Sequence, residues 1–183
     1  MNHIVKAGLA LSLLVATSAG CASTADDDIQ ENTRYQSQAE ITIDQAKQTA
    51  EAAQGETAIG IQLDEENGDL VYEVEFVEAD VLVDAGTGDI LATEPNDDSA
   101  ENAQYQSLAK ITLDQAKQTA EAAQGETAIG VQLDEEDGSL VYEVEFVAAD
   151  VFVDAGTGDI LATELENDSN ASPIQGSIQL SDN

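Results

Sequence analysis

The sequence predicts an α+β fold in two tandem copies, each with one helix packed on a four-stranded antiparallel meander sheet. Three observations lead there: an internal duplication, a capping pattern that opens a helix in each copy, and alternating apolar segments joined by tight-turn dipeptides. Residues 35–94 and 105–164 align without a gap at an offset of 70 and differ at eight of sixty positions. Such self-similarity indicates a repeated structural unit, here two domains over these two ranges.

Each predicted helix begins with a capping box. Thr42 stands three residues before Gln45, so its hydroxyl can accept from the amide of Gln45 while the glutamine side chain returns to the cap. The helix over residues 45–54 then ends at Gly55, and Thr112 opens the second copy in the same way. The apolar face of the first helix consists of Ile43, Ala46, Ala50 and Ala53.

The four strands of each copy follow from turn chemistry and alternation. Asn-Gly at residues 67–68 and Asp-Gly at 137–138 are strong signals for two-residue hairpin turns. Pairing residue 66 with 69 places the apolar side chains of both strands on one face. A second turn near Glu78 adds Val81 and Val83 to that face, and a loop over residues 85–88 brings back Ile90. The inner face of the hairpin is then Ile59, Ile61, Leu63, Tyr72, Val74 and Phe76.

The first twenty residues are predicted to be a signal peptide. Lys6 precedes a mostly apolar run over residues 7–19, which is too short to span a bilayer. Small residues then precede Cys21, which resembles the bacterial lipobox, whose cysteine receives lipid. The alternative is an ordinary signal peptide with a chance cysteine. The lipobox implies a lipid-anchored cell-envelope protein at the outer membrane, on the periplasmic side, or exposed at the cell surface.

Polar segments surround the two copies. Residues 21–34 are predicted to be an acidic tether, and residues 95–104 a linker that begins with Pro95. Residues 165–183 form a polar tail with the composition of a disordered segment. Its alternating Ile174, Ile178 and Leu180 leave docking as an edge strand as the alternative.

Charge and composition exclude several classes of function. The chain has 38 acidic against 5 basic residues, a net charge of −33, which repels nucleic acid and leaves the lipid anchor as its contact with a membrane. Its single histidine and cysteine, His3 and Cys21, leave no Cys/His zinc site, haem attachment motif or Ser-His-Asp triad. An enzyme is therefore the least favoured class.

Three motifs resemble the PepSY domain. They are Ile-Thr-Ile-Asp-Gln-Ala at residues 41–46, Val-Tyr-Glu-Val-Glu-Phe at 71–76 and Val-Asp-Ala-Gly-Thr-Gly-Asp-Ile-Leu at 83–91, all repeated nearly unchanged in the second copy. The resemblance implies a helix packed on a sheet. In metallopeptidase propeptides, such domains are thought to help inhibit or fold the peptidase. The sequence has no peptidase domain, so the resemblance implies a role in trans.

Acidic turns are the candidate metal sites. Ca²⁺ takes six to eight oxygen ligands, and acids gather at the hairpin tips and around the Gly-Thr-Gly turns. The alternative for each is a solvated or internally bonded turn. Glu73 and Glu75 share a strand face without a predicted cleft, so exposed like charges are favoured over a catalytic pair. No cofactor is expected beyond weakly bound Ca²⁺, for which the candidates are Asp64, Glu65, Glu66, Asp69, Asp84, Asp89, Asp134, Glu135, Glu136, Asp154 and Asp159.

The function expected from these observations is non-enzymatic binding of a protein partner, either a peptidase or another copy of the chain. The alternatives are a structural repeat protein that builds a surface layer or filament, and an acidic surface that binds cations such as Ca²⁺. An apolar strip on the sheet face away from the helix is the predicted interaction surface. We expect the two strips to pack on each other within the chain, with partner binding as the alternative. The strips consist of Leu82, Leu91, Phe152 and Leu161.

Overall fold

The capping box predicted for each copy sets where its long helix begins. In the computed structural model, which describes residues 24–166 and 175–180, the Gln45 amide donates to Thr42 Oγ1 at 3.2 Å. The Thr42 amide donates to Gln45 Oε1 at 2.8 Å. Gly55, with φ of 75°, ends helix α2 (Ile43–Gln54), and α4 (Leu113–Gln124) repeats this geometry. Both predicted helices are confirmed.

Tight turns join the strands in the predicted register. Asn67 and Asp137 have φ of 56° and 50°, and the glycines that follow them are also at positive φ. Glu66 lies opposite Asp69, and each copy forms a four-stranded antiparallel meander, as predicted. The strands are β1 (Gly60–Glu66), β2 (Asp69–Glu75), β3 (Ala79–Asp84), β4 (Ile90–Pro95), β5 (Gly130–Glu136), β6 (Ser139–Glu145), β7 (Ala149–Asp154) and β8 (Ile160–Leu165).

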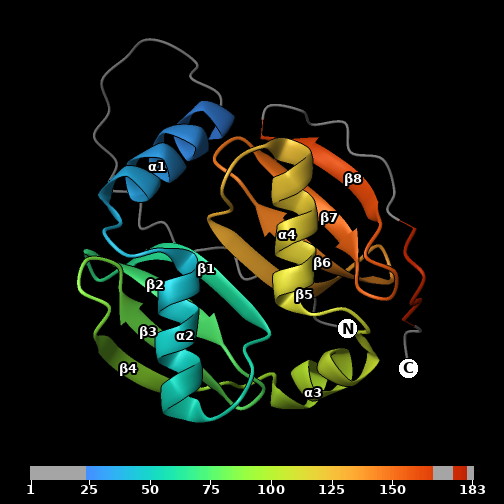
Figure 1. Ribbon diagram of the computed structural model, residues 1–183, viewed down its shortest axis with the longest axis horizontal. Helices are drawn as coiled ribbons and strands as arrows, with labels where there is room; N and C mark the ends of the chain where they lie inside the picture. Colours follow the sequence, from blue (N-terminus) through green and yellow to red (C-terminus); the bar gives the residue numbers. More distant parts are fainter. Residues whose placement is uncertain (1–23, 167–174, 181–183) are drawn as a thin grey trace.

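Strands β1 and β5 join the two meanders into one sheet, in the order β4-β3-β2-β1-β5-β6-β7-β8. The junction is antiparallel and centres on Ile61 opposite Val131. On either side, the Leu63 amide donates to the Ile129 carbonyl at 3.1 Å and the Leu133 amide donates to the Ile59 carbonyl at 3.2 Å. The halves are thus related by an approximate two-fold axis through the sheet, and α2 and α4 lie on the same face (Figure 1).

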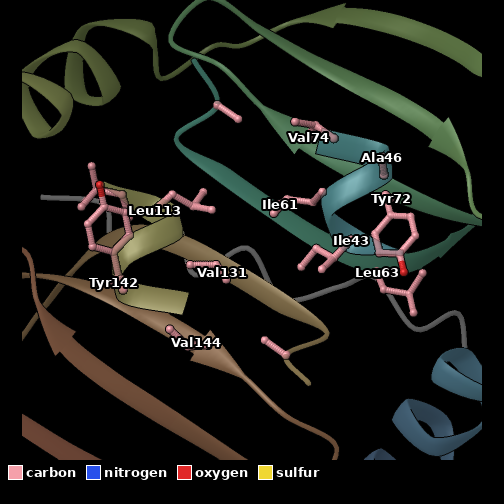
Figure 2. Close-up of a cluster of buried hydrophobic side chains, with 14 of the residues drawn as sticks. Ile43, Ala46, Ile61, Leu63, Tyr72, Val74, Leu113, Val131, Tyr142 and Val144 are labelled. Carbon is pink, nitrogen blue, oxygen red and sulfur yellow. The ribbon is translucent and has the colours of Figure 1, made fainter. Parts of the chain in front are cut away.

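One apolar cluster runs under both helices and through the junction. Ile61 and Val131 have no exposed surface, and Figure 2 shows them among side chains from α2, α4 and the central strands. Tyr72 lies in the same cluster, and its hydroxyl donates to the Ile41 carbonyl at 3.2 Å. The predicted placement of this tyrosine, inside the core with a hydrogen-bonded tip, is confirmed.

Two further helices lie where the sequence indicated a tether and a linker. Helix α1 (Thr24–Gln38) contacts β1, and α3 (Ser99–Leu108) contacts β5. Each is polar but carries one tyrosine that packs into the core: Tyr35 is 8% exposed and Tyr105 7%. A single aromatic anchor per helix is too sparse to give an apolar periodicity, so composition alone indicated a tether.

Two other segments differ from the expectation. Ile90 lies opposite buried Val83, on the predicted face, but is 40% exposed because β4 is an edge strand. Residues 175–180 of the tail lie against β6 through a bridge from Gln179 to Ser139. The predicted signal peptide, Cys21 and Ile174 lie outside the described residues.

Candidate functional site

The predicted apolar strips lie at opposite ends of the sheet. Leu82 and Leu91 are on β3 and β4 at one end, whereas Phe152 and Leu161 are on β7 and β8 at the other. The expectation that they pack on each other is therefore wrong. The physical reason is that the halves join through the open edges of β1 and β5, so the outer strands face away from each other (Figure 1).

The two strips also differ in exposure. Phe152 is 5% exposed and packs against Val141, with Leu161 and Ala162 partly buried beside it. Leu82 is half-buried, and Leu91 is 50% exposed. Leu91 is therefore the predicted surface residue most open to a partner.

The large apolar side chains that the described residues leave exposed all lie on the two edge strands. An edge strand carries unpaired backbone groups that a further strand can bond, so apolar side chains there mark a surface on which another chain can dock. Only Leu91 among them belongs to the predicted strips, because Ile90 was predicted on the inner face and its exposure depends on β4 being an edge strand. These residues are Ile90 and Leu91 on β4, and Ile160 and Leu165 on β8.

The carboxylates that precede the two Gly-Thr-Gly turns, those of Asp84 and Asp154, are bonded within the turns. Asp84 Oδ1 accepts from the amides of Gly86 at 2.9 Å and Thr87 at 2.7 Å. The bond from the Thr87 amide is the main cause that lowers the pKa of Asp84, because it stabilises the ionised form. Asp154 makes the same bonds in the second copy. This geometry is that of an Asx turn, the alternative that the sequence left open.

Of the other predicted metal ligands, Asp89 and Asp159 are exposed just before β4 and β8, and the rest lie at the hairpin tips. Asp64 and Asp134 each accept a bond from the next residue's amide, at 2.6 and 2.7 Å. Within the described ranges, the three acids that meet closely are instead Glu73, Glu75 and Asp80, whose oxygens lie within 4.8 Å of one another. Calcium binding at the predicted turns stays a prediction.

This acidic cluster arises from strand pairing. Glu75 on β2 lies opposite Asp80 on β3, and Glu73 lies on the same face two residues away. The sequence pattern indicated only the two glutamates, because their neighbour Asp80 on β3 depends on the strand register. At the corresponding positions of the second half, burial raises the pKa of Glu143 to about 8 and of Asp150 to about 7, and neighbouring carboxylates act in the same direction.

The groove between α2 and α4 contains ion pairs that the two-fold arrangement duplicates. Lys47 Nζ lies 3.1 Å from Asp114 Oδ1, and Lys117 Nζ lies 3.1 Å from Asp44 Oδ1. Each lysine also pairs with a glutamate one turn along its own helix. These cations are therefore matched by carboxylates and join the two halves, which makes the groove a structural contact.

Comparison with known proteins gives one family match and one solved structure. The model of the PepSY family, described as peptidase propeptide and YPEB domain, matches residues 40–94 and 110–164. A crystal structure of a candidate lipoprotein from Clostridium difficile 630 is 22% identical, covers 64% of this chain and 88% of its own, and has a TM-score of 0.37. No curated protein matches the chain. Among the described residues, the helices are all too short or too polar to cross a membrane.

Proposed function

Because the chain belongs to the PepSY family, with two tandem PepSY domains, we propose that it binds a protein partner and regulates a peptidase in trans. In this proposal the protein is non-enzymatic and is held in the cell envelope by lipid on Cys21. The chain's only histidine and cysteine, His3 and Cys21, precede both domains, so neither domain carries a cysteine or histidine nucleophile–base pair.

The observation that carries partner binding is the apolar character of β4 and β8. Leu91 on β4 is 50% exposed and Leu165 on β8 is 57% exposed, on a chain that otherwise presents a dense acidic surface. An extended segment of a partner can add to either edge through backbone hydrogen bonds. Leu91 or Leu165 then contacts apolar groups of the partner. The recognition would then depend on apolar contact rather than on charge alone.

The test is a pull-down from envelope extracts with wild-type chain and with Leu91→Glu, followed by peptidase-inhibition assays. Burying an apolar side chain contributes about 1.5–3 kcal/mol, so a charge at half-exposed Leu91 is expected to weaken binding about tenfold or more. Thr57→Glu is the matched control, because Thr57 is an exposed polar residue outside β4 and β8. Failure to recover a stable partner at moderate salt, or equal loss in both variants, would contradict the proposal.

Self-association is a second candidate, because the same two edges are nearly identical in sequence. Strand β4 reads Ile-Leu-Ala-Thr-Glu-Pro and β8 reads Ile-Leu-Ala-Thr-Glu-Leu, at opposite ends of one sheet. Pairing β4 of one molecule with β8 of the next is a head-to-tail contact, which propagates into a filament or layer. Electron microscopy of concentrated protein tests it, and a strictly monomeric particle argues against it.

Cation binding is a third candidate, favoured by the cluster of Glu73, Glu75 and Asp80. Three carboxylates within 4.8 Å repel one another, and a divalent cation would relieve that repulsion. Calorimetry with Ca²⁺ distinguishes a site, which saturates at a small stoichiometry, from general screening of an acidic surface. Glu73→Gln should remove the saturating phase, whereas Glu56→Gln, which removes an exposed carboxylate from the loop after α2, should leave it intact.

A further inference from the structure

The tail shows how the second half holds an extended peptide. Residues 175–180 lie beside the start of β6, past the end of β7. The Leu140 amide donates to the Ile178 carbonyl at 3.0 Å, and the Leu180 amide donates to the Gly138 carbonyl at 2.7 Å. These bonds extend the antiparallel ladder by a short added strand. Backbone hydrogen bonds of this kind provide the affinity when a peptide adds to a sheet.

Side-chain contacts provide the specificity for the sequence of the bound segment. Ser177 Oγ donates to Asp154 Oδ1 at 2.6 Å, and its amide donates to the same carboxylate. The Gly176 amide and Gln179 Nε2 both donate to Ser139 Oγ, at 2.8 and 2.9 Å. Ile178 packs against the edge of the main core. The site therefore recognises a hydroxyl residue, then an aliphatic residue, then a hydrogen-bond donor.

Docking of the tail changes what the second half exposes. Leu140 has no exposed surface and Asp154 is 1% exposed. Burial by itself raises the pKa of Asp154, but the bonds from Ser177, Thr157 and Gly156 outweigh it and keep the pKa below its ordinary value. The carboxylate therefore stays ionised beneath the tail at neutral pH.

The first half contains the corresponding site, on which no segment of the described residues lies. Leu70 and Asp84 correspond to Leu140 and Asp154, and both are only half-buried. A Cβ added to Gly156 would meet Ser177 and Ile178 of the tail, whereas one added to Gly86 would meet only Asp84. In the described part of the chain, the space taken by the tail in one half is therefore open in the other.

One substitution between the copies changes the chemistry of the open site. Ser139, which accepts from Gly176 and Gln179, is replaced by Asp69, which is exposed. A carboxylate is longer than a hydroxyl, so it reaches towards the position of Gln179, and it adds a negative charge there. A cationic side chain at that position of the peptide satisfies the carboxylate better than a neutral amide does.

We propose that the site formed by Asp69, Leu70 and Asp84 binds an extended segment of a partner protein that follows the pattern of the tail, with Lys or Arg at the position of Gln179. The segment adds a strand beside β2, its Ser or Thr hydroxyl donates to Asp84, its aliphatic residue covers Leu70, and its cation pairs with Asp69. This rests on the proposed partner binding and deepens it by adding a second surface, apart from the β4 and β8 edges, together with the chemistry of the segment that it takes.

Two blocked peptides test the site on the full chain by NMR. One has the sequence of residues 175–181, Gln-Gly-Ser-Ile-Gln-Leu-Ser, and the other carries Lys at the position of Gln179. Both should shift the amide signals of Leu70, Gly86 and Thr87. At 150 mM salt the Lys peptide should bind about threefold or more tightly than the Gln peptide, the scale of an exposed ion pair.

Two variants then assign the preference. Asp69→Ser should abolish the advantage of the Lys peptide, whereas Glu94→Ser, which removes one exposed carboxylate from β4, should preserve it. The proposal is overturned if neither peptide shifts these amides, or if the preference for Lys is absent or independent of Asp69. A failure here, together with a recovered partner that is sensitive to Leu91→Glu, would refute this site and leave the proposed function standing.

Discussion

The junction between β1 and β5 makes a sharp prediction about cooperativity. Ile61 and Val131 face each other at its centre, and both have no exposed surface. Ile61→Ala removes three carbons, which at about 0.8 kcal/mol each plus a cavity term lowers the free energy of unfolding by about 3–4 kcal/mol. Val131→Ala, which removes two carbons, should lower it by about 2–3 kcal/mol.

Urea unfolding followed by far-UV circular dichroism measures both effects, since the chain has no tryptophan. If the halves share one core, each variant moves a single transition, and the double variant differs from the sum of the two by about 0.5 kcal/mol or more. Ile90→Ala is the control, because Ile90 is 40% exposed at the sheet edge, and it should change stability by less than about 1 kcal/mol.

The reasoning is refuted by two separate unfolding transitions, of which Ile61→Ala moves only one. That result would mean that each half has its own sufficient core and that the junction is a weak contact. Additive effects of the two substitutions would point the same way, because residues in contact at a shared core are expected to couple.

Four other predictions concern local structure and charge. Thr42→Ala should cost about 1 kcal/mol in urea unfolding, through loss of the capping bond. Asn67→Val should destabilise the hairpin by more than 1 kcal/mol and Asn67→Gly by much less, because φ there is 56°; equal losses would contradict this. Lys47→Met should cost about 1 kcal/mol or less, with a loss that shrinks as salt is added. With the pKa of Glu143 raised to about 8 and that of Asp150 to about 7, stability should fall as pH rises from about 4 to 8 at constant ionic strength, since the folded state holds protons that the unfolded chain releases.

Local signals accounted for most of each repeat. Thr42 and Gln45 lie in one turn of helix, and Asn67 and Gly68 are adjacent, so their interactions require no knowledge of distant residues. The hairpin register then followed, because alternation of apolar side chains and the turn agree on only one pairing. For the same reason Tyr72 was placed correctly in the core.

Features that depend on sparse or distant contacts escaped prediction. Tyr35 and Tyr105 hold α1 and α3 against the sheet, but one tyrosine in a polar helix is indistinguishable from an exposed one in sequence. Asp80 joins Glu73 and Glu75 only through the pairing of β2 with β3. Ile90 lies opposite buried Val83 and is exposed because β4 ends the sheet, and the order of strands is not written in any one segment.

By itself, the sequence determined the repeat, the helix caps, the hairpin turns and the acidic charge, because each rests on neighbouring residues or on composition. Only the tertiary structure decided that the two meanders join through β1 and β5. It also decided that residues 175–180 cover the site in the second half, whereas no other described segment covers the corresponding site in the first. In both cases the two copies present nearly identical surfaces, so the local sequence does not show which of them is used. Their free-energy differences come from residues far apart in the chain, such as Ile61 with Val131 and Ser139 with Gln179, which become neighbours only after folding.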